Sequence, residues 1–163
     1  LDGKQFHVSS SARHDSSSDR NKFSILAAGA YGDLEAMVQV VDHSLSERNL
    51  HDDVTMSANG LDGEQESLFT KLKYNLNDSI SFTLTADEQN WSGDWNVATD
   101  VGMSFFPAIV NTSSSLGQDR GFRDRYSLDI DLEINSIFAK SASVKFYSQT
   151  TCLLYTSDAA DDL

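Results

Sequence analysis

The chain is poor in cysteine and in basic residues, and each shortage excludes classes of protein. Cys152 is the single cysteine among 163 residues, so the chain offers no disulfide framework and no thiolate cluster for a metal. Lysine and arginine number 12 against 25 aspartate and glutamate residues, which gives a formal net charge of -13. Nucleic-acid binding requires basic patches that neutralise phosphates. A polybasic anchor on a membrane surface likewise requires clustered lysine and arginine residues. We therefore expect no nucleic-acid partner and no such anchor.

The chain also lacks long apolar runs and the motifs of common enzymes. No run reaches the roughly 18 apolar residues of a transmembrane helix, although the strands of a membrane barrel give a much weaker hydropathy signal. A Gly-x-Ser-x-Gly motif, a phosphate-binding glycine loop and a zinc-protease helix are absent. The serine triplets at 9–11 and 113–115 have no base placed beside them. We expect no enzyme, no catalytic residue, no bound metal and no cofactor.

The last dozen residues, Cys152 to Asp162 above all, resemble translated laboratory DNA. The codons TGT CTC TTA TAC ACA TCT GAC GCT GCC GAC spell Cys152 to Asp161 and are similar to the transposon end and adapter of sequencing libraries. We therefore expect residues 152–163 to be a non-native tail, with no native structure beyond Thr151, and residues 1–151 to be a partial domain. The chain opens on Leu1 and not on Met, which agrees with a fragment. Without the tail, the charge is 12 minus 22, or -10.

Apolar and polar residues alternate with a period of two in several segments. In residues 80–87, Ile, Phe, Leu and Ala alternate with Ser, Thr, Thr and Asp. Similar alternation occurs in residues 34–40, 67–76, 126–134 and 141–149. Successive side chains of a β-strand point to opposite faces, so each segment has one apolar and one polar face. The alternation predicts an all-β protein.

The connections between these segments alternate in length. Residues 31–33, 77–78 and 135–136 contain Asn, Asp or Gly, which tolerate the positive φ of tight hairpins. Residues 44–64 and 90–123 form long polar connections, and residues 13–20 form a shorter one. One short-turn end and one long-loop end are typical of an antiparallel up-and-down meander.

The polar face indicates which architecture the meander builds. A soluble sandwich or lipocalin-like barrel turns its apolar face inward, whereas an outer-membrane barrel turns it toward lipid. Asp129, Asp131 and Glu133 share one face of a strand, and the polar faces of other strands carry Lys71, Lys73 and Lys145, which suits a wet lumen. Residues 79–89 and 125–135 match the roughly 9 to 11 residues that cross a bilayer, while soluble strands average about 5 or 6. We predict a fragment of a transmembrane β-barrel, a curved open sheet of about six or seven strands with its apolar side convex.

Three stretches resemble the TonB-dependent outer-membrane receptors, and most of all their haemoglobin, transferrin and lactoferrin receptor branch. They are Gly-Asp-Leu-Glu-Ala at 32–36, Gln-Glu-Ser-Leu-Phe-Thr-Lys-Leu-Lys-Tyr-Asn-Leu-Asn-Asp at 65–78 and Arg-Asp-Arg-Tyr-Ser-Leu-Asp at 123–129. The resemblance covers most of residues 22–149. It implies a barrel of 22 strands, plugged by an N-terminal domain, that imports an iron compound with energy delivered from the inner membrane.

The resemblance also implies a location and partners. The location is the cell outer membrane of a Gram-negative bacterium. The partners are outer-membrane lipid, the barrel's own plug domain, TonB and an extracellular iron-containing ligand, with the plug and the TonB contact lying outside this chain. No ligand residue of the family maps onto the chain, so haem, a siderophore, an iron-protein and a similar nutrient all stay open. The alternatives are a soluble β-sandwich or lectin-like binding module, and a simple porin or adhesin barrel.

The expected loops contain the candidate ligand-binding residues. The loop at 90–123 holds four large aromatic residues, a residue type that dominates binding hot spots: Trp91, Trp95, Phe105 and Phe106. They could equally pack the loop against itself or lie at the lipid boundary. His43 and His51 could coordinate haem iron, or be ordinary exposed loop histidines. The acidic run at 51–53 lacks the spacing of a calcium loop.

Overall fold

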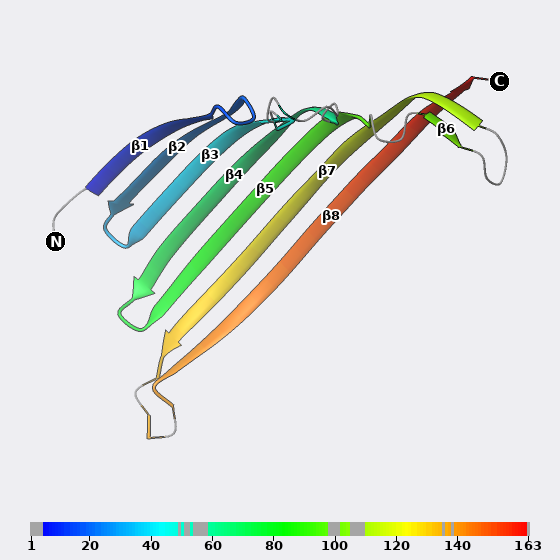
Figure 1. Cartoon of the computed structure of the whole chain (residues 1–163). Helices are drawn as coiled ribbons and strands as arrows, with labels where there is room; N and C mark the ends of the chain where they lie inside the picture. Colours follow the sequence, from blue (N-terminus) through cyan, green and yellow to red (C-terminus); the bar gives the residue numbers. More distant parts are fainter. Residues whose placement is uncertain are drawn as a thin grey trace.

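The computed structural model describes residues 5–48, 50, 53, 59–97, 102–104, 110–134, 136–137 and 139–162. Within these residues the chain forms eight β-strands and no helix (Figure 1). The strands are β1 (Gln5–Asp15), β2 (Arg20–Tyr31), β3 (Leu34–Ser46), β4 (Gly60–Asn77), β5 (Ile80–Asn96), β6 (Gly102–Ser104), β7 (Val110–Glu133) and β8 (Ser141–Asp162). The prediction of an all-β fold is confirmed.

The strands form one antiparallel sheet in which the long strands pair in the order of the sequence, β5 pairing with β7. The short strand β6 pairs with the start of β7, in line with β5, so that seven strands succeed one another across the sheet. The strands β1 and β8 lie at the two edges, and the described residues contain no pairing between them. The predicted up-and-down meander is confirmed, and the sheet is open.

The predicted short turns agree with the structure better than the predicted long loops at the opposite end of the sheet. Two-residue turns at 32–33 and 78–79 connect β2 to β3 and β4 to β5, and Gly32 takes the positive φ of 57°. The prediction of a tight turn at 135–136 is wrong, because the longer connection 134–140 separates β7 from β8. At the other end, residues 47–59 form the long connection from β3 to β4, while residues 16–19 make only a short turn.

The loop expected over 90–123 is mostly strand. The strand β5 continues to Asn96, and β7 begins at Val110. Serine, glycine and aspartate in these stretches indicate loops when they are considered locally. However, β5 and β7 satisfy each other's backbone groups from Ile80 and Leu132 to Asn96 and Leu116, and this pairing does not depend on side-chain polarity.

Residues beyond Thr151, which the sequence predicts to be a non-native tail, are part of the sheet. The strand β8 continues to Asp162 along β7, with Leu153 opposite Gly121 and Tyr155 opposite Asp119. A long neighbouring strand offers backbone donors and acceptors to any segment that follows, whatever its origin. The adapter origin of residues 152–163 stays a prediction, because backbone pairing does not distinguish native from foreign sequence.

The sheet is a single layer, and no apolar side chain among the described residues is buried. The buried residues with side chains are polar, Ser18, Thr83 and Asp87, and the others are Gly93 and Gly117. Soluble domains pack at least two layers around an apolar core, and this part of the chain has no second layer. No helix of membrane-spanning length and hydropathy occurs in the part of the chain that the structure describes.

Candidate functional site

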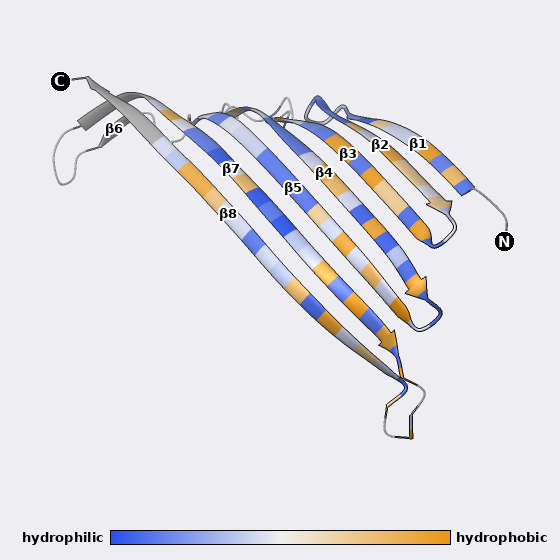
Figure 2. Ribbon diagram, turned by 180° about the vertical axis from the view of Figure 1, so that it is seen from behind, coloured by the Kyte–Doolittle hydropathy of each residue, from blue (hydrophilic) through white to orange (hydrophobic). Residues whose placement is uncertain are grey.

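One face of the sheet carries a continuous apolar band. Figure 2 shows hydrophobic residues at alternate positions along the strands, toward the end with the short turns. Directly opposed residues form a row that crosses the whole sheet: Phe6, Gly29, Ala36, Leu72, Leu84, Leu128 and Phe146. Neighbouring rows on the same face complete the band. The side chains are open to the surroundings, since Val40 is 50% exposed, Leu84 51% and Phe146 58%.

The opposite face is polar and more crowded. It presents Lys71, Lys73 and Asp129, and the amine of Lys145 lies 3.0 Å from Asp129 Oδ1. Thr83 and Asp87, which are 9% and 8% exposed, lie on this face. Side chains converge on the concave side of a curved sheet and diverge on its convex side. This difference in exposure is therefore the one expected if the sheet curves toward its polar face.

The upper limit of the apolar band, away from the short turns, crosses the strands obliquely. We define it by one apolar residue on each strand, after which the next residue of this face is polar: Ala12, Phe23, Val40, Leu68, Ala86, Tyr126 and Phe146. Below this limit, Ser10 on β1 and Thr70 on β4 interrupt the apolar residues. In three strand pairs these residues stand directly opposite each other. In the other three pairs the limit moves two residues toward the short turns, because Phe23 faces Asp42, Leu68 faces Glu88 and Tyr126 faces Ser148.

This displacement gives the tilt of the strands relative to the band. Three shifts of two residues over six strand pairs average one residue per strand. A rise of about 3.3 Å per residue and a strand spacing of about 4.8 Å then give a tilt of about 35°. Transmembrane barrels tilt their strands by about 35 to 45°. On β2 the band runs from Phe23 to Tyr31, about 22 Å along its normal, which approaches the apolar height of about 25 Å in such barrels.

A polar boundary follows the apolar limit. On four successive strands the next residue of this face is acidic: Asp42, Glu66, Glu88 and Asp124. The hydroxyl of Tyr126 donates a hydrogen bond of 2.7 Å to Glu88 Oε1 across this boundary. Tyrosine suits such a position because its ring is apolar and its hydroxyl is polar.

The predicted ligand-binding tryptophans lie on the polar face of β5 and not in a loop. Trp91 stands opposite Gly121 of β7, and Trp95 stands opposite Gly117. The indole nitrogen of Trp95 donates a hydrogen bond of 2.9 Å to Asp119 Oδ2. Trp91, Gly93 and Trp95 are spaced by two residues, which is the spacing of one face of a strand. This spacing indicates a strand where the sequence analysis predicts a loop.

The structure brings one predicted histidine into line with the tryptophans. His43 lies in β3 opposite Gln65, and Gln65 lies opposite Trp91, so the three residues share a row of the polar face. His51, Phe105 and Phe106 lie outside the described residues. Among the residues that the structure does describe, no group of three or more His, Cys, Asp or Glu side chains is placed to hold a metal ion.

An ion-pair cluster adjoins the tryptophans on the same face. The carboxylate of Asp87 accepts a hydrogen bond of 2.5 Å from Arg125 Nη2, and Arg123 Nη2 lies 3.4 Å away. Arg123 stands opposite Gln89, and Gln89 is the residue next to Trp91 on this face of β5. Gln89, Gln65, Asp119 and Arg123 were not singled out from the sequence, because their proximity to Trp91 depends on strand register.

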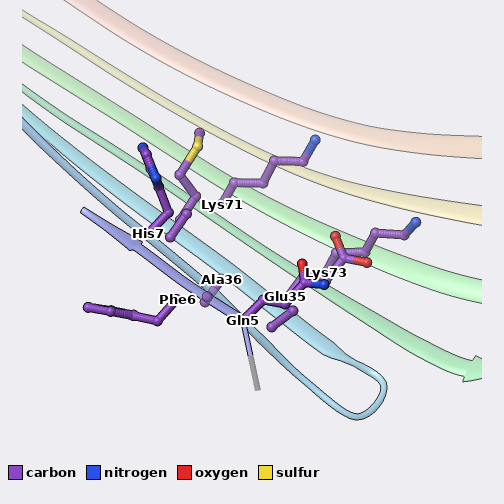
Figure 3. Close-up of a pocket in the computed structure, with 11 residues that line it drawn as sticks. Gln5, Phe6, His7, Glu35, Ala36, Lys71 and Lys73 are labelled. Carbon is purple, nitrogen blue, oxygen red and sulfur yellow. The ribbon is translucent and has the colours of Figure 1, made fainter. Parts of the chain in front are cut away.

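A separate hollow of about 500 Å³ opens on the polar face near the edge strand β1. Its lining includes His7, Glu35, Lys71 and Lys73, from β1, β3 and β4. Figure 3 shows the polar ends of these side chains extending from the sheet, while Phe6 points away from them. The hollow is open and its charges are mixed, so it indicates a solvated lining without a defined ligand site.

No protein-family model matches the chain, and no curated protein sequence is significantly similar to it.

Proposed function

We propose that the chain is part of the wall of an outer-membrane β-barrel, and more narrowly of a TonB-dependent transporter that takes up an iron compound or a similar nutrient. The observation that carries the barrel proposal is the uncovered apolar band. Its upper limit runs across the sheet as one line, and the strands are tilted by about 35° relative to the band. A flat bilayer requires the apolar face of tilted strands to end along a line that is oblique to the rows of directly opposed residues. The core of a soluble sandwich does not require such a line.

A bilayer accounts for the band better than water does. Exposed apolar area costs about 25 cal/mol per Å² in water, and the band leaves Leu84, Phe146 and their neighbours open. Acyl chains against the band would remove this cost. The short turns would then face the periplasm and the long connection at 47–59 the outside, as is usual in outer-membrane barrels.

The transporter part of the proposal depends on the resemblance of residues 32–36, 65–78 and 123–129 to TonB-dependent receptors. The charged polar face suits a lumen filled by a plug domain. The partners would be outer-membrane lipid, the plug, TonB and an extracellular iron-containing ligand. A simple porin or adhesin barrel has the same kind of wall, so the uninterrupted gene tests this part: we expect it to encode a plug domain ahead of Leu1.

Thiol accessibility tests the barrel proposal. In a Cys152→Ser background, Leu84→Cys places a thiol in the band and Thr85→Cys places one on the opposite face of the same strand. In phospholipid vesicles we expect a water-soluble maleimide to label the thiol at position 85 and to spare the one at position 84. A Glu66→Cys variant, just above the band, is the second labelled control.

Two results contradict the proposal. One is equal labelling of positions 84 and 85 in vesicles. The other is a soluble monomer in detergent-free buffer with a cooperative unfolding transition, because the open edges of β1 and β8 and the uncovered band predict aggregation there.

A further inference from the structure

We propose that the polar face carries a binding platform for a neutral saccharide. The platform consists of two indole rings and the polar side chains beside them: Trp91, Trp95, Gln65, Gln89, Asp119 and Arg123. It lies on β4, β5 and β7, and none of its residues belongs to the tail from Cys152 onward. The inference does not depend on transport, because the sheet itself presents the platform.

The backbone holds the ring of Trp91 flat. A Cβ added at Gly121 would overlap Cζ2 and Cε2 of Trp91, so the indole covers the glycine on the neighbouring strand. Only glycine leaves room for a ring in this place. With one face against the backbone, the indole has its other face available to a flat, apolar ligand surface.

The ring of Trp95 is held by a different contact. Its indole nitrogen lies 3.6 Å from the Cβ position of Gly93 and donates to Asp119 Oδ2 at 2.9 Å. The two tryptophans are four residues apart on one face of a strand, which separates them by about 13 Å. Two fixed rings at this distance suit an extended ligand with repeated flat units, such as an oligosaccharide.

The charges of this region favour an uncharged ligand. Two carboxylates, those of Asp87 and Asp119, accompany two guanidinium groups, those of Arg123 and Arg125, so the formal charges cancel. Asp87 is already paired with both arginines. A strongly anionic or cationic ligand would find no net opposite charge here, whereas the amides of Gln65 and Gln89 can both donate to and accept from hydroxyl groups.

Two polar atoms beside Gly121 remain unpaired. Asp119 Oδ1, an acceptor, and Arg123 Nε, a donor, are buried and make no hydrogen bond to any residue that the structure describes. Buried polar atoms are normally paired, and these two are exceptions. Both atoms are closed to solvent, so the platform presents to a ligand the indole faces and the Gln65 and Gln89 amides, and not these two atoms.

The platform lies clear of the apolar band. Trp91 is five residues beyond Ala86, which corresponds to about 14 Å along the band normal at a tilt of about 35°. In a membrane the platform would therefore face the aqueous interior on the side of the long connections, where a dissolved sugar can reach it.

The test uses the full chain in lauryldimethylamine oxide micelles, a detergent without a sugar headgroup. Maltohexaose, cellohexaose and mannohexaose are titrated while tryptophan fluorescence and heat are recorded. We expect at least one of them to quench and shift the fluorescence, and Trp91→Ala to weaken its binding by at least about fivefold, as truncation of a hot-spot aromatic does.

Two glycine variants test the platform without removing a tryptophan. Gly121→Ala displaces the Trp91 ring and also brings its Cβ within 2.9 Å of the Cys152 carbonyl oxygen of β8, and we expect it to weaken binding as Trp91→Ala does. Gly117→Ala, four residues away on the same face, meets no atom closer than 3.7 Å and is expected to bind like the unchanged chain. Circular dichroism checks the β-sheet content of every variant.

Three outcomes overturn the proposal. The first is a folded chain that responds to none of the three hexasaccharides. The second is binding that Trp91→Ala and Gly121→Ala leave unchanged. The third is binding of hemin or ferric citrate with the same dependence on Trp91 but without any response to sugars, which would assign the platform to an iron compound and leave the barrel proposal standing.

Discussion

An arginine scan through the sheet tests the membrane role of the apolar band most directly. Leu128 lies within the band on β7, between Leu84 and Phe146 and about 5 Å below the upper limit at Tyr126. Ser127 is the preceding residue and points to the polar face, between Thr85 and Tyr147, so neither position has a charged residue directly opposite. Leu128→Arg and Ser127→Arg therefore introduce the same charge at nearly the same depth on opposite faces. Ala86→Arg places it at the upper limit of the band.

The depth of each position sets the expected cost. An arginine on the lipid face of a barrel costs about 2 to 4 kcal/mol at the bilayer midplane and about 0 to 1 kcal/mol near the interface. Leu128 lies between the midplane and the upper limit, so we expect Leu128→Arg to lower the free energy of unfolding by about 2 kcal/mol, Ala86→Arg by no more than about 1 kcal/mol, and Ser127→Arg by less still. With a urea dependence of about 2 kcal/mol per M, Leu128→Arg lowers the urea midpoint by about 1 M.

Urea titrations of the chain in phospholipid vesicles, followed by tryptophan fluorescence, measure these midpoints. The order of the three variants matters more than any single value. A soluble sheet with an exposed apolar face would tolerate all three arginines. A closed apolar core would penalise Ala86→Arg as strongly as Leu128→Arg. Either result refutes the assignment of the band to lipid.

Three further predictions concern the ends and the polar face of the sheet. Asp87→Asn leaves two guanidinium groups without their carboxylate, and we expect a loss of about 1 to 3 kcal/mol in urea titrations, moderated because Arg123 and Arg125 are 37% and 41% exposed; a neutral effect would show that the cluster is not coupled to folding. Gly32→Ala forces a side chain into a φ of 57° and should cost about 1 kcal/mol in the same assay, whereas Gly32→Asn should cost less. Hydrogen bonds from the Ser17 hydroxyl and amide lower the pKa of Asp15 below 3.8, and one from the Leu61 amide lowers the pKa of Glu47 below 4.5. Both carboxylates therefore stabilise their turns at a pH above these values, and this stabilisation is lost as the pH falls through the pKa of the folded state. We expect the hydrogen-exchange protection of the Ser17 and Leu61 amides to decrease on acidification. Protection that stays constant with pH would contradict this prediction.

The period-two alternation predicts the band residues of β3, β4, β5, β7 and β8, but not those of β1 and β2. Ile80 to Asp87 alternate as predicted, and the glycine and asparagine turns fall at 32–33 and within one residue of 77–78. The lengths of β5, β7 and β8 were not predictable in the same way. Beyond the band both faces of these strands are largely polar, so hydrophobic alternation disappears while backbone pairing continues.

The candidate site was predicted by residue type but not by position. The sequence predicts Trp91 and Trp95 as aromatic residues of a binding loop, whereas both lie on the strand β5. Their contacts with Gly121 and Asp119 depend on the register between β5 and β7, which is a long-range property. Because a one-residue slip would turn every side chain of a strand to the other face, no local pattern could assign these partners.

The strands lengthen across the sheet, from β1 with 11 residues to β7 with 24 (Figure 1). On β2 only Arg20 to Lys22 extend past the apolar limit, whereas on β7 the strand extends from Val110 to Arg125. At the tilt of about 35° these lengths correspond to about 8 Å and about 43 Å above the band. If the sheet is part of a barrel wall, as proposed, the outer rim of that wall rises from β2 to β7. A large ligand that approaches from outside would then contact β7 first, whereas a small solute would pass over the shorter strands beside β2.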